Sequence, residues 1–133
     1  MTTLLFDTSV FICHLRDENG RCTDYLQQVT SGTLAGIISV LTLTELYAGE
    51  KLSADGERIV DSLIQPFQMI DVGSDISVEA GRLVRQWRRS HGIGVIDALI
   101  AATALAEEVP VLTLNARHFD FIPGLVVLNP VAG

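Results

Sequence analysis

Three acidic residues lie next to or within apolar segments of this sequence. Asp7 directly follows a short apolar run near the N-terminus, and Asp97 lies near the start of the apolar segment 95–108. Glu45 lies among leucines in the segment Leu-Thr-Leu-Thr-Glu-Leu-Tyr. An ionised carboxylate in apolar surroundings needs a charged or hydrogen-bonding partner. Because residues 90–116 contain no Lys or Arg, the sequence gives Asp97 no nearby ion-pair partner.

A divalent metal ion would supply the positive charge that these acids lack. Mg²⁺ and Mn²⁺ prefer oxygen ligands, and Mg²⁺ is commonly held by one or two carboxylates together with several waters. A metal-bound water is a better nucleophile, and the metal offsets negative charge on a phosphate in the transition state. We therefore interpret Asp7, Glu45 and Asp97 as a site for metal-assisted hydrolysis of phosphodiester bonds.

Each acid also has a structural alternative. Asp7 precedes a predicted helix and could cap it. Asp97, in the first turn of a helix, would gain about 0.3–1 kcal/mol from the helix dipole. Glu45 could be an ordinary surface residue. Phosphotransfer with Asp7 as a nucleophile is a rival enzyme class, but the haloacid-dehalogenase pattern has a second aspartate two residues later, where Ser9 stands here.

The elements that must position these acids alternate between strand and helix along the chain. This alternation predicts an α/β fold with a mainly parallel sheet, in which ligand sites lie beyond the carboxyl ends of strands. Strands are predicted over residues 3–6, 34–38, 67–72, 111–113 and 125–128. Helices are predicted over residues 9–15, 23–30, 40–47 after a Ser39 cap, 54–64, about 75–90 after a Ser74 or Asp75 cap, and 95–108. Asn19-Gly20 is predicted as a break, and residues 114–122 as a loop with a short turn.

Length and composition favour one ordered domain over residues 1–133 with an aliphatic core, because apolar residues make up 48% of the chain and aromatic residues 6%. No apolar run reaches the roughly 18 residues of a membrane span, and the N-terminus has no secretory signal pattern. The two cysteines, Cys13 and Cys22, lack the spacing of a disulfide framework or a zinc site. We expect a cytoplasmic protein that does not act at a membrane.

The net charge of −7 argues against binding of nucleic acid over the whole surface, because phosphates require local positive charge. Four of the nine basic residues nevertheless lie close together, as Arg82, Arg85, Arg88 and Arg89. Arg82, Arg85 and Arg89 are spaced to share one helical face. This face is either a solvated surface or a contact for RNA phosphates.

Five short motifs, in this order and at these spacings, resemble PIN-domain proteins and most closely the VapC-type toxins of bacterial toxin–antitoxin pairs. The resemblance covers nearly the whole chain. The motifs are Leu-Leu-Phe-Asp-Thr-Ser-Val at residues 4–10, Thr-Glu-Leu-Tyr-Ala-Gly at 44–49, Ile-Asp-Ala-Leu-Ile-Ala-Ala-Thr-Ala at 96–104, Thr-Leu-Asn-Ala-Arg-His-Phe at 113–119 and Ile-Pro-Gly-Leu at 122–125.

The resemblance implies a central parallel sheet of four to five strands flanked by helices in three layers. It implies Mg²⁺- or Mn²⁺-dependent endoribonuclease activity, with Asp7 and Asp97 at the principal metal positions and Glu45 as a further catalytic acid. It also implies a homodimer that is inhibited by a cognate antitoxin, whose basic segment enters the acidic pocket. The negative net charge fits a basic inhibitory partner.

The chain departs from the family pattern in the loop after the predicted fourth strand. Asn115 and His118 occupy places where the family often has an aspartate. Asn115 could still act as a metal ligand or hold a metal-bound water, and Asp120 is a candidate substitute acid. Arg117, together with Arg85 and Arg89, could contact RNA. The departure weakens the case for a second metal ion and leaves a non-catalytic binding module of the same fold as the alternative function.

Overall fold

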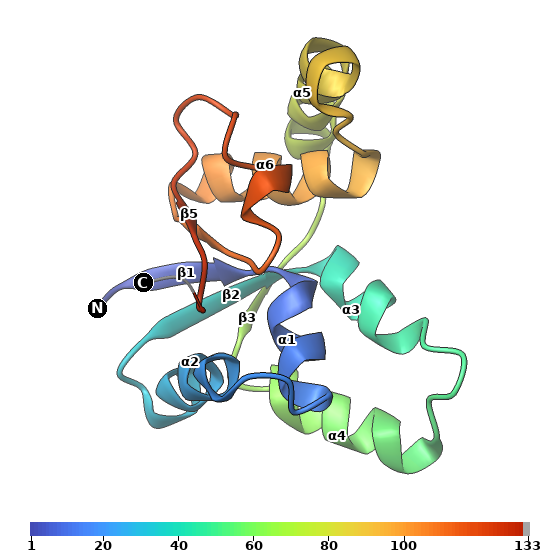
Figure 1. Cartoon of the computed structure of the whole chain (residues 1–133), viewed down its shortest axis with the longest axis vertical. Helices are drawn as coiled ribbons and strands as arrows, with labels where there is room; N and C mark the ends of the chain where they lie inside the picture. The colour runs from blue at the N-terminus through green and yellow to red at the C-terminus, as the bar shows by residue number, and fades with distance from the viewer. Residues whose placement is uncertain (132–133) are drawn as a thin grey trace.

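A five-stranded parallel sheet runs through the middle of the structure, a computed structural model in which residues 1–131 are described (Figure 1). The strands lie in the order β3-β2-β1-β4-β5, and each neighbouring pair is parallel. Their bounds are β1 Thr3–Phe6, β2 Ala35–Ser39, β3 Gln68–Ile70, β4 Val111–Leu112 and β5 Val127–Leu128. The predicted α/β class with a parallel sheet is confirmed.

Helices cover both faces of this sheet. Figure 1 shows α5 and α6 on one side, and α1, α2 and α4 on the other. The helices are α1 Thr8–Leu15, α2 Gly20–Ser31, α3 Val40–Tyr47, α4 Ala54–Ile64, α5 Ser74–His91 and α6 Val95–Glu107, with a 3₁₀ turn η1 at Ala116–His118. The three layers implied by the family resemblance are therefore present.

Alternate residues of the central strand β1 supply the two halves of the core. Leu4 and Phe6 pack in a cluster with α1, α2 and α4, whereas Leu5 packs in a second cluster with α5 and α6. Successive side chains of a strand point to opposite faces of the sheet, so an entirely apolar strand must be covered on both sides. The apolar segment before Asp7 is therefore the central strand of the sheet.

Several element boundaries differ from the sequence-based expectation. The pair Asn19-Gly20 was predicted as a break, but α2 begins at Gly20 because the Asn19 side chain accepts a hydrogen bond from the backbone N–H of Arg21 (2.8 Å). Helix α5 is preceded by Gly73, so Ser74 and Asp75 lie within the first turn and are not the cap. Strands β3, β4 and β5 are shorter than predicted because only two or three of their residues pair with a neighbouring strand.

The turn between the last two helices places Asp97 at a helix start. Gly92 ends α5 in the left-handed conformation (φ 66°), which costs glycine no strain. Helix α6 begins at Val95, directly after its cap residue Gly94, and Asp97 lies in its first turn. Among residues 1–131 no helix is both long and apolar enough to cross a membrane.

Candidate active site

Asp7 lies just beyond the end of β1 and is almost fully buried, with 7% of its surface exposed. Its Oδ2 accepts hydrogen bonds from the hydroxyls of Ser9 (2.8 Å) and Thr113 (2.9 Å). The side chain makes no capping bond to α1, so the structural alternative of a helix cap does not explain it. Within the described residues its Oδ1 has no hydrogen-bond partner and is therefore available to a ligand.

The same two hydroxyls fasten the loop after β4 to Asp7. Ser9 Oγ accepts a hydrogen bond from the backbone N–H of Leu114 (3.1 Å), and Thr113 Oγ1 accepts one from the backbone N–H of Asn115 (3.0 Å). Each hydroxyl thus donates to the carboxylate and accepts from the loop. This arrangement fixes the loop relative to the end of β1.

Asp97 lies in the first turn of α6, near enough to Asp7 for the two carboxylates to interact. Its side chain is about a third exposed (32%), and its Oδ2 lies 3.0 Å from Nδ1 of His118. Burial raises the pKa of Asp97, His118 opposes that rise, and the nearby carboxylate of Asp7 adds to it. The contribution of Asp7 indicates that the two carboxylates are close enough to repel each other.

Asp97 nevertheless has a side-chain partner in His118, which the expectation overlooked because it considered only Lys and Arg close in the sequence. His118 lies on the 3₁₀ turn η1, which brings its ring to the start of α6. A neutral or protonated imidazole can donate a hydrogen bond to a carboxylate. The residue that replaces an expected aspartate in the loop is therefore the residue that contacts Asp97.

Glu45 lies on α3 and is exposed. Its Oε1 accepts a hydrogen bond from the Thr8 hydroxyl (2.7 Å), which also lies 3.0 Å from the hydroxyl of Thr42. Because Thr8 directly follows Asp7, this bond places Glu45 at the same edge of the sheet as the other two acids. Helix α3 follows β2, the neighbour of β1, which explains how the fold brings it there.

The structure brings Asp7 and Asp97 together but does not by itself form a closed ligand cage. In residues 1–131 no group of three His, Cys, Asp or Glu side chains is arranged to hold a metal ion. The two neighbouring carboxylates, with the free Oδ1 of Asp7, fit a hard divalent cation that keeps much of its water shell. The donor set is oxygen only, as Mg²⁺ and Mn²⁺ prefer.

The remaining residues predicted for the site have different surroundings. Asn115, Arg117 and His118 line a pocket of about 220 Å³ beside the acids. Asp120 is exposed and makes no ion pair in the part of the chain that the structure describes. Arg85 and Arg89 are exposed on α5, and no hydrogen bond or ion pair among residues 1–131 links them to the acids.

Sequence reasoning missed Ser9 and Thr113 as partners of Asp7. In the sequence, Ser9 served only as an argument against phosphotransfer. A hydroxyl two residues after a carboxylate can nevertheless donate a hydrogen bond to that carboxylate, as Ser9 does to Asp7. One feature of the sequence could have indicated Thr113: it follows an apolar run, just as Asp7 does. That the two strands are neighbours could not be inferred without the strand order.

Comparison with known proteins agrees with this geometry. A family model described as PIN domain matches residues 4–124. The chain belongs to the PIN-domain family. It is 36% identical over 124 residues to a protein named ribonuclease VapC19 from Mycobacterium tuberculosis, covering 91% of this chain and 95% of that protein. It is also 36% identical over 123 residues to ribonuclease VapC10 of the same species, covering 92% and 90%.

Solved structures of this PIN-domain family share the fold over the full length. The VapBC complex of Salmonella typhimurium bound to DNA matches with a TM-score of 0.80 at 25% identity, covering 98% of this chain and 99% of that one. VapBC2 of Rickettsia felis, bound to a promoter DNA fragment, matches with a TM-score of 0.78 at 25% identity, covering 96% and 98%.

Proposed function

We propose that this PIN-domain protein is a metal-dependent endoribonuclease and the toxin of a toxin–antitoxin pair. The observation that carries the proposal is the pair of interacting carboxylates, Asp7 and Asp97, at the carboxyl end of the parallel sheet. Two relatives at 36% identity are named ribonucleases, and the matching solved structures include VapBC complexes. The names of these relatives and the geometry of the two acids therefore both support hydrolysis of RNA.

Asp7 and Asp97 are the residues that would hold a divalent cation. When bound, Mg²⁺ or Mn²⁺ supplies an activated water and offsets charge on the scissile phosphate. Asp7 is oriented for this role because Ser9 and Thr113 occupy only its Oδ2. In Asp97 the contact with His118 likewise involves only Oδ2. Each carboxylate therefore keeps one oxygen that can face the cation.

Glu45 acts beside this pair as a helper. The Thr8 hydroxyl holds its Oε1, so the orientation of the carboxylate is linked to the chain segment of Asp7. Its Oε2 makes no hydrogen bond within the described residues and can accept a proton from the attacking water. Such general-base assistance typically contributes about 10²–10⁴-fold to a rate.

The partner is a cognate antitoxin that places a basic segment against the acidic site. The net charge of −7 favours a basic partner, and two neighbouring carboxylates without a bound cation attract a guanidinium or ammonium group. We also expect a homodimer, as the family resemblance implies. Binding of the antitoxin would then displace the cation and block the RNA.

The nuclease assignment is tested by RNA cleavage with Mn²⁺ and with EDTA. We expect cleavage only with Mn²⁺, abolished in Asp7→Asn and in Asp97→Asn. Glu45→Gln keeps the acceptor for Thr8, so it should fold normally and lose about 10²-fold or more in kcat. Asp24→Asn, an exposed change on α2, is the matched control and should cleave like the wild type. Equal cleavage by wild type and both active-site variants would exclude this nuclease site.

Toxicity is tested separately in cells. Expression of the chain alone should arrest the growth of a host that lacks the antitoxin, and Asp7→Asn should restore growth. Unimpaired growth with both proteins at equal abundance would reject the toxin assignment. A non-catalytic binding module remains the second candidate because Asn115 stands where the family often has an acid.

A further inference from the structure

A polar pocket opens beside the acids at the outer end of β4 and β5. It has a volume of about 220 Å³, which corresponds to several water molecules at about 30 Å³ each. Its walls come from the loop after β4 and from the residue that follows β5. The lining residues are Leu114, Asn115, Ala116, Arg117, His118 and Asn129.

The pocket offers hydrogen-bond donors and no carboxylate. This is notable in a chain with 16 acidic and 9 basic residues. Arg117 forms no ion pair among the described residues, so its guanidinium is free to bind a ligand. Asn129 uses its Oδ1 to accept a hydrogen bond from the backbone N–H of Val131 (3.0 Å), which leaves its NH₂ group free to donate to a ligand. Such a set of donors suits an anion.

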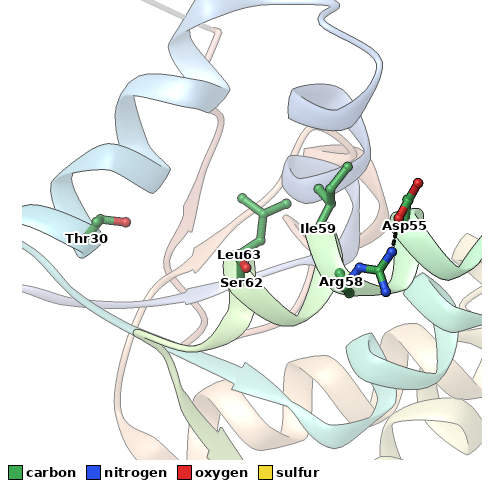
Figure 2. A pocket seen from close by; sticks show the side chains of 6 residues that line it. All are labelled: Thr30, Asp55, Arg58, Ile59, Ser62 and Leu63. Carbon is green, nitrogen blue, oxygen red and sulfur yellow. Dashed lines mark hydrogen bonds and ion pairs between the residues drawn. The ribbon is translucent and has the colours of Figure 1, made fainter.

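The pocket between α2 and α4 provides a contrast within the same molecule. Figure 2 shows Arg58 there paired with Asp55 on the same helix, so the positive charge is already balanced. Exposed Ile59 also lines that pocket. A phosphate would find no unbalanced charge at that site, whereas Arg117 offers one.

The loop that forms the pocket is attached to both carboxylates of the active site. At its start, Thr113 and Ser9 bind Asp7 and the backbone of the loop. At its end, His118 contacts Asp97. A group bound between these attachment points is therefore held at a fixed offset from the two carboxylates, which is what positioning of a substrate requires.

We propose that this pocket binds a phosphate of the RNA strand next to the cleaved bond, with Arg117 and the amide groups of Asn115 and Asn129 as donors. The inference rests on the proposed nuclease function and adds a substrate-positioning site to it. Asn115 is then a substrate contact, in place of the metal ligand considered from the sequence. The site also gives an acidic protein the local positive charge that binding to RNA needs.

The test is the affinity for a short single-stranded oligoribonucleotide in EDTA, measured by fluorescence anisotropy at several salt concentrations. Arg117→Gln should raise Kd about 10-fold or more, the loss expected for a charge-assisted hydrogen bond. It should also lower the slope of log Kd against log salt by about 1. Asn129→Asp, which places a negative charge in the pocket, should raise Kd by at least as much.

Two control variants carry the same charge changes elsewhere. Arg21→Gln removes an exposed arginine on α2, and Asn19→Asp adds a carboxylate while keeping the helix cap. Both should change Kd less than about 2-fold if screening limits distant charges. If the pocket variants bind RNA no more weakly than these controls, the phosphate site is excluded, even where Mn²⁺-dependent cleavage is intact.

Cleavage kinetics separate this inference from the proposed function. With Mn²⁺, Arg117→Gln should raise KM and leave kcat nearly unchanged, because it removes binding energy common to substrate and transition state. A fall in kcat at unchanged KM would overturn phosphate binding as the role of Arg117. RNA bound through the pocket with no cleavage under any metal would instead refute the nuclease and leave the phosphate site in place.

Discussion

Replacing Thr113 by valine tests whether its hydroxyl holds the active site together. The side chain is fully buried, and valine keeps its shape while removing the hydroxyl. Two hydrogen bonds of 3.0 Å or less are lost at once, one donated to Asp7 (2.9 Å) and one accepted from the backbone N–H of Asn115 (3.0 Å), together with a longer contact to the Ser9 hydroxyl (3.4 Å). The bond to a carboxylate is worth about 1.5–3 kcal/mol, and an unpaired N–H costs about 1–3 kcal/mol.

The expected loss of unfolding free energy is about 2–4 kcal/mol. It is smaller than the sum of these two energies because Asn115 is exposed, so water can replace the bond to its backbone N–H. At roughly 4 °C per kcal/mol for a chain of this size, Tm should fall by roughly 8–16 °C. Thr113→Ser is the matched control. It keeps both bonds and loses one methyl group, so it should cost only about 1 kcal/mol.

The assay is urea unfolding followed by far-UV circular dichroism in EDTA, with Asp7→Asn included as a second variant. If Thr113 stabilises the fold through its bond to Asp7, the loss of unfolding free energy caused by Thr113→Val should be at least about 1 kcal/mol smaller in the Asp7→Asn protein than in the wild type. With Mn²⁺, loss of this support should reduce metal affinity or activity about 10–100-fold. Equal stability of Thr113→Val and Thr113→Ser would refute the reasoning.

Three further predictions concern stability alone. The folded pKa of Asp97 is raised, so in the metal-free protein its ionisation favours the unfolded state as pH rises above the unfolded value of about 3.9. Asp97→Asn should therefore raise Tm in EDTA at pH 7 more than at pH 4, and the same shift in the exposed control Asp24→Asn would contradict this. Gly36→Ala should lower the free energy of unfolding by about 1–3 kcal/mol, because a Cβ there would lie 2.5 Å from the ring of Phe67. Gly81→Ala, in a helix with open space around it, should gain about 0.5–1 kcal/mol in the same unfolding assay.

The helices and the central strand could be predicted because their signals are local. The apolar run before Asp7, the Ser39 cap of α3 and the long apolar stretch of α6 each depend on residues within one element. The helix boundaries that failed did so for local reasons too. The pair Asn19-Gly20 is typical of a chain break, but the Asn19 side chain can equally begin a helix.

The partners of the acids could not be predicted, because they come from elements that are distant in the sequence. Thr113 and Asp7 are separated by 106 positions and meet only because β1 and β4 are neighbours in the sheet. The order of the strands depends on which face of the sheet each connecting helix packs against. No pattern within a single helix or strand indicates that face. The acids themselves were identifiable, whereas the hydroxyls that orient them were not.

His118 shows how a departure from the family pattern can be informative. Judged by residue type, it removes an expected acid from the site and weakens the case for a second metal ion. In the structure it contacts Asp97, while Thr113 at the other end of the same loop contacts Asp7. A fourth carboxylate at this position would add repulsion to a pair that already raises the pKa of Asp97. A histidine bonds Asp97 without adding negative charge, and it leaves the neighbouring Arg117 free to bind phosphate. In the proposed function the loop therefore holds Asp7 and Asp97 for one cation and presents Arg117 to an adjacent phosphate, and it supplies no ligand for a second cation.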